Sequence, residues 1–218
     1  MTVTDAASQT TRELVIAAAI RLFGRNGYDA TSVRQIAREA GGQNVALVSY
    51  YFGSKDGLRR ACAEAIVARM SSVLPGEGGD TPELDREAAC TRIEAFCFSV
   101  LDYMTLVPEA QDVAAFMLRE LAAPGEVFDI VYTGLIEARH GAVCRLWAIA
   151  TDSDATSAET RLTVFALLGQ ILYFRIGRTV VQRRLGWEAI GPAEVAQIKA
   201  VLRINLRAAI AAHAKAMP

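Results

Sequence analysis

Apolar residues recur every three to four positions along almost the whole chain, and no run alternates strictly between apolar and polar residues. A period near 3.6 is typical of helices that bury one face, whereas strict alternation is typical of strands. The pattern therefore predicts an all-α protein. A first helix is expected over 11–26, ending at Gly27, with an inward stripe of Leu14, Ala17, Ala18 and Leu22.

Three further helices are predicted before residue 75. The second covers 33–40, begins after a cap at Thr31 or Ser32, and turns Val33, Ile36 and Ala37 inward. Gly41-Gly42 forms a turn, and Asn44 caps a short third helix that ends near Tyr50. Ser54 caps a fourth, long helix that continues to about residue 74, with Asp56 at its positive end.

The segment 75–82 marks the clearest boundary, because its sequence Pro-Gly-Glu-Gly-Gly-Asp-Thr-Pro is incompatible with a helix and is typical of a flexible loop. Five more helices are expected after it, for about nine in total: 83–105, 108–122, 125–150, 156–186 and 192–214. We therefore predict an N-terminal domain over 1–60, linked through the fourth helix to a second domain over 83–218.

Charge is distributed unevenly, although the net charge is only −1. Residues 1–60 carry eight Lys or Arg against five Asp or Glu, whereas 77–160 carry five against sixteen; residues 161–218 carry nine against two. A basic head before an acidic middle suits a protein with one DNA-facing end. Solvation of exposed helix faces by acidic residues explains the middle segment equally well.

Several functional classes find no support in the sequence. Cys62, Cys90, Cys97 and Cys144 form no CxxC pair, so buried free thiols in a reducing compartment are expected, with no metal and no cofactor. The longest apolar stretch is too short for a membrane span, and residues 1–11 are polar, which predicts a soluble cytoplasmic protein. His140 and His213 lack catalytic partners at motif spacing, and no phosphate loop or nucleophile elbow is present, so no enzyme is predicted.

The short third helix has the size and position of a DNA-recognition element. A short helix after a glycine turn fits the major groove, which is about 12 Å wide. Val48 and Phe52 would hold it to the core, while polar groups reach bases or phosphates. Lys55 stands where the first turn of the fourth helix already favours an anion. The candidate DNA-binding residues are Thr31, Arg34, Asn44, Val45, Ser49, Tyr50, Tyr51 and Lys55. Capping alone would also explain Thr31 and Asn44, and core packing would explain Tyr50.

The segment 31–41 (TSVRQIAREAG), followed by 48–58 (VSYYFGSKDGL), resembles the DNA-binding domain of the TetR family of transcriptional regulators. The resemblance implies that the first three helices read DNA and that the fourth links them to a ligand-binding and dimerisation domain. Two departures affect the register of the recognition helix. One extra residue stands between Ala40 and Phe52, and Ser49 and Tyr51 replace the Tyr and His that are usual in the family.

The C-terminal part resembles the CecR/CerR-like branch of these regulators, through 116–124 (FMLRELAAP), 167–175 (LLGQILYFR) and 184–186 (RLG). Members of that branch are implicated in responses to antibiotics and other toxic compounds, which implies a similar role for this chain.

The stretch 162–176 is apolar on nearly every side, so it should be buried on nearly every side. With the last helix it predicts a four-helix bundle across a two-fold axis, and hence a homodimer. A central helix in a monomer is the alternative. The candidate interface residues are Phe165, Leu168, Leu172, Ile176, Ile198 and Leu202.

Aromatic residues and methionines gather in the fifth to seventh helices, where they indicate either an ordinary core or a ligand pocket. The candidate pocket residues are Phe96, Tyr103, Met104, Phe116, Met117, Tyr132 and His140. Taken with the resemblance, they predict a ligand-responsive regulator: a repressor that binds an inverted repeat in double-stranded DNA and leaves it when a small, largely apolar effector binds. An architectural DNA-binding or partner-binding protein without an effector is the alternative, and an all-helical enzyme is a distant third.

Overall fold

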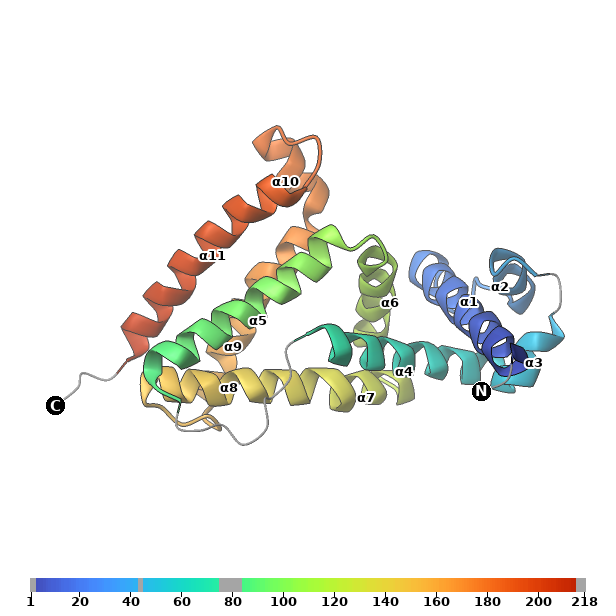
Figure 1. Cartoon of the computed structure of the whole chain (residues 1–218), viewed down its shortest axis with the longest axis horizontal. Helices are drawn as coiled ribbons and strands as arrows, with labels where there is room; N and C mark the ends of the chain where they lie inside the picture. The colour runs from blue at the N-terminus through green and yellow to red at the C-terminus, as the bar shows by residue number, and fades with distance from the viewer. Residues whose placement is uncertain (1–2, 43–44, 75–83, 215–218) are drawn as a thin grey trace. The chain divides into compact units, whose positions relative to one another are not determined.

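The computed structural model describes residues 3–42, 45–74 and 84–214, and these residues are helical apart from short turns (Figure 1). They fall into two compact units. The first contains residues up to Met70 together with Gln111–Leu135, and the second contains Ser71–Ala110 and the chain from Ile136 onward. The predicted all-α class is confirmed.

The first unit is built from the N-terminal helices and two helices from the middle of the chain. In order these are α1 (Val3–Asn26), α2 (Val33–Glu39), α3 (Ala46–Phe52), most of α4 (Lys55–Val73), α6 (Ala110–Ala122) and α7 (Glu126–Val131). Gly27 ends α1 as predicted, with a φ of +89° that only glycine adopts readily. The buried side of α1 differs from the predicted stripe by about one residue: Leu14 is 52% exposed, whereas Val15 and Phe23 are buried.

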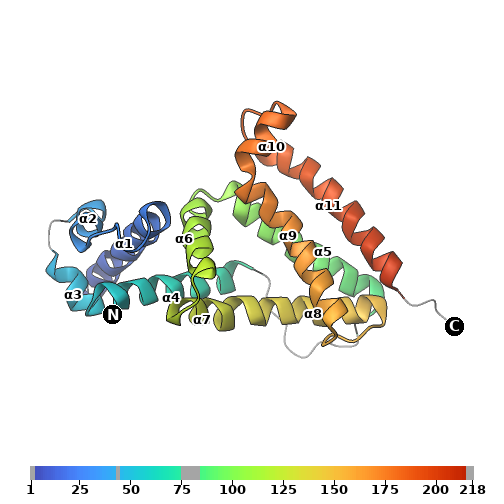
Figure 2. The same ribbon diagram turned by 180° about the vertical axis from the view of Figure 1, so that it is seen from behind.

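The second unit consists of α5 (Arg86–Leu106), α8 (Ala138–Thr151), α9 (Ala158–Ile176), α10 (Arg178–Leu185) and α11 (Pro192–His213). Helix α5 packs against α8, α9 and α11, as Figures 1 and 2 show from opposite sides. Trp147, Ile93 and Leu101 are almost completely buried and form the centre of this core.

Two of the predicted helices are divided in the structure. The predicted helix 125–150 contains α7, a π-helical segment (Tyr132–Glu137) and α8. The predicted helix 156–186 is broken at Gly177, where α9 and α10 meet at 75°. Hydrophobic periodicity continues through both breaks, so the sequence pattern did not reveal them. Among the described residues no single helix is long and apolar enough to cross a membrane, although the bent pair α9 and α10 passes that test jointly by length and composition.

Candidate nucleic-acid interface

Helix α3 is anchored to the first unit by one side and presents polar groups on the other. Val48 is 1% exposed and fixes the helix to the core, as predicted. Ser49 is exposed, and Tyr50 is 80% exposed. The exposure of Tyr50 rules out core packing as the reason for its presence, so its ring and hydroxyl are available to a partner.

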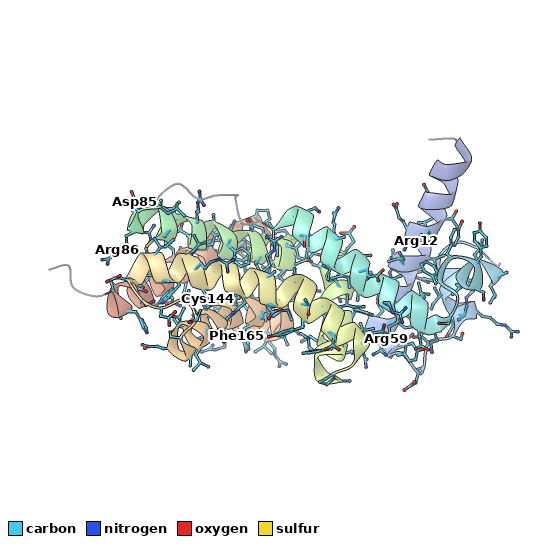
Figure 3. The ribbon with its side chains drawn as sticks, turned by 90° about the horizontal axis from the view of Figure 1, so that it is seen from below. Arg12, Arg59, Asp85, Arg86, Cys144 and Phe165 are labelled. Carbon is cyan, nitrogen blue, oxygen red and sulfur yellow. The ribbon has the colours of Figure 1, made fainter. Side chains whose placement is uncertain are left out.

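A row of aromatic side chains in contact with one another continues from this exposed face toward α4. The Tyr50 and Tyr51 rings meet edge to face at 5.0 Å, and Tyr51 and Phe52 lie 6.0 Å apart. The Arg12 guanidinium of α1 lies 5.4 Å from the centre of the Phe52 ring (Arg12 is labelled in Figure 3). These contacts orient the exposed Tyr50 and the half-buried Tyr51 relative to α1.

The start of α3 differs from the prediction. The helix begins at Ala46 and ends at Phe52, two residues beyond the predicted end, and its N-cap position is the exposed Val45, which supplies no side-chain cap. Asn44, the predicted cap, lies outside the described residues, so its role stays a prediction. The one-residue-longer turn falls in the same stretch.

Helix α2 supplies two exposed cations. Ser32 rather than Thr31 caps it: the Ser32 hydroxyl accepts from the Gln35 backbone, and the Gln35 side chain accepts from the Ser32 backbone. Arg34 is exposed, and so is Arg38 one turn later. Arg38 was not among the predicted residues, although its i, i+4 spacing from Arg34 places both on one face of α2.

Thr31 has a structural role instead. Its side chain is 1% exposed, and its hydroxyl lies 2.7 Å from the Gly27 carbonyl and 3.2 Å from that of Leu22, where α1 ends. The hydroxyl therefore satisfies terminal carbonyl groups of a helix. This burial gives no support to the predicted phosphate contact.

Helix α4 begins as predicted, because the Ser54 hydroxyl accepts a hydrogen bond from the Gly57 backbone at 3.0 Å. Lys55 lies in its first turn and donates to the Tyr28 carbonyl at 2.6 Å, with its ammonium 4.0 Å from the centre of the Tyr28 ring. The predicted cation is thus in place beside α3, although it already has a partner.

Helix α6 is bound to both α1 and α4 by charged groups. Arg59 of α4 (labelled in Figure 3) donates two hydrogen bonds to Glu120, at 2.9 and 2.6 Å, and the Glu120 side chain is only 5% exposed. The hydrogen bond with Glu120 raises the pKa of Arg59. Arg119 donates to the carbonyls of Gly24 and Arg25 at the end of α1. Helix α6 is therefore tied to the helices that carry the exposed face.

The seven predicted pocket residues divide between the two units. Phe116 is fully buried in the first, where Tyr132 is 41% exposed and stacks on Phe128. Met117 also belongs to the first unit, whereas Phe96, Tyr103, Met104 and His140 belong to the second. A small apolar hollow in the second unit, with room for about one water, is lined by none of the seven. Its lining is Cys97, Phe98, Leu167, Gln170, Ile171, Leu202 and Leu206.

The predicted dimer residues separate into an exposed and a buried group. Phe165, Leu172 and Ile176 of α9 are 52%, 40% and 58% exposed, and Leu168 is half-buried. Ile198 and Leu202 of α11 are 3% and 8% exposed, so they belong to the core of their own unit, and their assignment to an interface is corrected. Helical periodicity could not separate the two faces of α11, because both carry apolar side chains.

The four cysteines are free and buried, as expected. Burial raises the pKa of Cys97 to about 12, so this thiol stays protonated and unreactive at neutral pH. His140 is buried as well: one ring nitrogen lies 3.1 Å from the Arg161 carbonyl and the other 3.6 Å from the Cys144 sulfur. The Phe165 ring stacks on the imidazole at 3.9 Å (Phe165 and Cys144 are labelled in Figure 3). Within the described residues no group of three potential metal ligands comes together.

Comparison with known proteins agrees with this geometry. Residues 15–62 match the family model of bacterial regulatory proteins of the TetR family, and residues 89–213 match the C-terminal domain of the HTH-type transcriptional dual regulator CecR. The chain is 33% identical over 184 residues to CecR of Shigella flexneri, covering 82% of this chain and 81% of the relative. It is 47% identical over 55 residues to the regulatory protein RaaS of Mycobacterium tuberculosis, which covers 25% of each chain.

Solved structures show the same fold. The chain resembles AibR in complex with isovaleryl coenzyme A and operator DNA with a TM-score of 0.67 at 15% identity, covering 88% of this chain and 96% of AibR. It resembles a TetR-like regulator from Rhodococcus sp. RHA1 with a TM-score of 0.58 at 21% identity, covering 92% and 96%. Members of this family are regulators rather than enzymes, as expected. The exposed face of α3, the family models at both ends and the relationship to CecR lead to one conclusion: the chain belongs to the TetR family of DNA-binding transcriptional regulators, in the branch that shares the CecR C-terminal domain.

Proposed function

We propose that this protein is a homodimeric, ligand-responsive repressor that binds an inverted repeat in cytoplasmic DNA and releases it when a small, largely apolar molecule binds. The observation that carries the proposal is an apolar strip on the exposed side of α9. Its members with more than a third of their surface exposed are Leu162, Phe165, Leu172, Tyr173 and Ile176.

This strip has the properties of an unpaired interface. The opposite side of α9 is occupied, because Val164, Leu167 and Ile171 are buried in the second unit. Leaving the strip in water costs free energy at about 25 cal/mol for each Å² of apolar surface. A two-fold axis brings the same strip of a second copy against it, and the exposed Val201 and Ile204 of α11 offer further apolar surface on the same unit.

A two-fold dimer also dictates the form of the DNA site. Each protomer presents one α3, so two recognition helices read one face of the duplex, about 34–36 Å apart. The Ser49 and Tyr50 face supplies polar groups to that groove, and Lys55 supplies a cation to the phosphates.

The effector part of the proposal rests on the fold. AibR, which shares this fold, was solved with isovaleryl coenzyme A and operator DNA together. In this chain the buried aromatic side chains of Phe96, Tyr103 and Trp147 provide apolar surface within the second unit. Helix α6 is bound to α4 through the Arg59–Glu120 pair and to α1 through Arg119. A ligand that favours the DNA-incompetent state lowers DNA affinity, and DNA lowers ligand affinity by the same factor.

The dimer is tested by replacing Phe165 with Glu and measuring mass by light scattering at micromolar concentration. We expect a dimer for the wild-type chain and a monomer for Phe165→Glu, because a charge would be buried without a partner. Leu118→Glu is the matched control, since Leu118 is 44% exposed on α6 and lies outside the strip. A monomeric wild-type chain contradicts the proposal.

The effector is tested by titrating antibiotics and small aromatic compounds into a complex with DNA from beside the protein's own gene. We expect at least one compound to lower DNA affinity and the footprint on DNA to have two-fold symmetry. If the footprint is symmetric but no compound of the panel changes affinity, an architectural DNA-binding role replaces the effector-controlled one.

A further inference from the structure

Tyr28 follows α1 and meets the first turn of α4. Its ring packs on Phe23 at 5.5 Å between centroids, and its carbonyl accepts the hydrogen bond from Lys55. Its hydroxyl donates to the Asp56 carboxylate. One aromatic residue therefore holds two neighbouring residues of opposite charge through separate groups.

Holding the Lys55 and Asp56 charges apart matters because both residues lie in the first turn of α4. Asp56 is favourable in the first turn of a helix, whereas a lysine there is opposed by the helix dipole. The Tyr28 carbonyl and the face of its ring offset this cost by attracting the Lys55 ammonium. Burial raises the pKa of Tyr28 to about 12, with the Asp56 hydrogen bond as the second cause, so the phenol remains a donor at neutral pH.

The other cations at the start of α4 are neutralised by carboxylates. Arg59 pairs with Glu120, and Arg60 lies 2.8 Å from Glu126. Lys55 is held by a carbonyl and an aromatic ring, which are neutral, so its positive charge is not cancelled by its partners. Asp56 is held by a neutral phenol in the same way.

We propose that Tyr28 is a positioning residue for DNA binding, which keeps the Asp56 carboxylate from pairing with Lys55 and so leaves Lys55 its full charge for a backbone phosphate. The proposal rests on the Lys55–phosphate contact of the proposed function. DNA binding then replaces the Tyr28 carbonyl by a phosphate oxygen as the acceptor of the Lys55 hydrogen bond. Without the phenol, the Asp56 carboxylate loses its hydrogen bond and lies near the Lys55 ammonium, which is held against the same aromatic ring. An ion pair between Asp56 and Lys55 then cancels the positive charge of Lys55.

The test uses a fluorescent random-sequence 30-base-pair duplex, because phosphate contacts are independent of sequence. Dissociation constants are measured by anisotropy over a range of salt concentrations for the full chain and for Tyr28→Phe. The substitution retains the ring and removes only the hydroxyl. Each lost phosphate contact is expected to weaken binding about eightfold at 0.1 M salt and to reduce the salt slope by about one unit.

Rescue separates this role from a purely structural one. Tyr28→Phe combined with Asp56→Asn is expected to restore both the affinity and the slope, because no carboxylate is left to capture Lys55. Thermal unfolding confirms that both variants are folded. A wild-type slope for Tyr28→Phe, or no recovery in the double variant, overturns the proposal.

Two further measurements distinguish this inference from the proposed function. If Lys55→Ala leaves affinity and slope unchanged while the wild-type chain binds DNA, Lys55 makes no phosphate contact; the inference then fails and the regulator remains. If the wild-type chain does not bind duplex DNA at any salt concentration, the proposed function fails first.

Discussion

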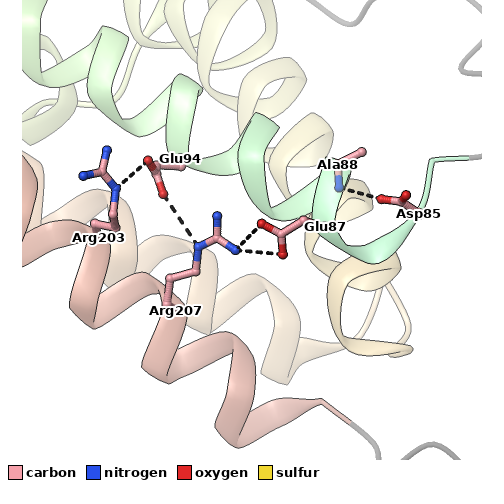
Figure 4. A network of polar contacts seen from close by, with 6 residues as sticks. All are labelled: Asp85, Glu87, Ala88, Glu94, Arg203 and Arg207. Atoms are coloured by element: carbon pink, nitrogen blue, oxygen red, sulfur yellow. Dashed lines mark hydrogen bonds and ion pairs between the residues drawn. The ribbon is translucent and has the colours of Figure 1, made fainter.

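Guanidinium–carboxylate pairs hold helices together in both units, but they do so in different surroundings. In the first unit Arg59 and Glu120 join α4 to α6 with side chains 26% and 5% exposed. In the second unit a row of ion pairs, here called the ladder, joins α5 to α11. Its exposed end is the pair of Arg207 and Glu87, whose side chains are 38% and 73% exposed (Figure 4). Coulomb energy is screened by water, and unpaired charges are costly only out of water. Ion pairing should therefore be a structural requirement between Arg59 and Glu120, and a minor contribution between the exposed Arg207 and Glu87.

Helices α5 and α11, which the ladder joins, are also attached to each other in a different way from α6. Beneath the ion pairs, Ile198, Leu202 and Leu206 of α11 are buried in an apolar core. Helix α6 instead contributes Arg119 to the end of α1 and Asp112 to Arg21 and Arg25 of the same helix. Polar groups thus add to apolar packing in fixing the position of α6 against α1, and a displacement of α6 requires these groups to exchange partners.

The largest effect is expected from Glu120→Ala, which leaves the Arg59 guanidinium without its partner. Removing one member of a buried pair costs roughly 3–5 kcal/mol, and about 3 kcal/mol is expected here because a quarter of Arg59 remains in water. Chemical denaturation measures the loss. Replacing both residues, as Arg59→Met with Glu120→Leu, should recover most of it. A loss below about 1 kcal/mol for Glu120→Ala would show that the pair behaves like a surface pair.

A second test concerns how closely α1 and α6 approach. A methyl group at Gly24 would lie 2.9 Å from the Asp112 carbonyl oxygen and 3.0 Å from the Phe116 nitrogen, and both are backbone atoms that cannot turn aside. Gly24→Ala should therefore cost about 1–3 kcal/mol, the usual range for overpacking. Gly141→Ala is the control: its methyl group would meet only the end of the Arg145 side chain, at 3.6 Å, so a small gain in helix stability is expected.

The cap of α2 should contribute less. Ser32→Ala removes an acceptor for the Gln35 backbone, with an expected cost of about 1 kcal/mol. Thr31→Ser is the informative comparison, because it keeps the hydroxyl that lies against Gly27 and Leu22. Equal losses for Thr31→Ala and Thr31→Ser would contradict the role assigned to that hydroxyl.

Much of the first unit was predictable from sequence because local signals determine it. Gly27 and Ser54 act within a few residues of their own positions, so the end of α1 and the start of α4 could be located. The exposed side of α3 followed from the single buried residue Val48. The attachment of α6 was not predicted, because Arg59 and Glu120 are 61 residues apart and neither forms a local motif.

The second unit was harder to predict for the opposite reason. Its helices are apolar over more than one face, so periodicity located them without showing which side is buried. Ile198 and Leu202 were assigned to an interface although they are buried, while Val201 and Ile204 are exposed on the same helix. The bend at Gly177 and the π-helical segment were not predicted, because apolar residues recur at helical spacing through both.

The smallest effect is expected from the exposed end of the ladder. Arg207 donates to both oxygens of Glu87 at 2.8 and 3.0 Å, yet exposed pairs typically contribute about 0.2–1 kcal/mol. Glu87→Gln should therefore reduce the free energy of unfolding by about 0.5 kcal/mol or less. The loss should disappear in 1 M salt, where charges are screened within about 3 Å.

Glu94 provides the contrast along the same helix: it is 14% exposed and lies 2.7 Å from Arg203. Glu94→Gln should cost more than Glu87→Gln and retain most of its cost in high salt. Equal losses for the two variants at both salt concentrations would show that burial does not set the strength of these pairs, and the contrast between the two units would lose its physical basis.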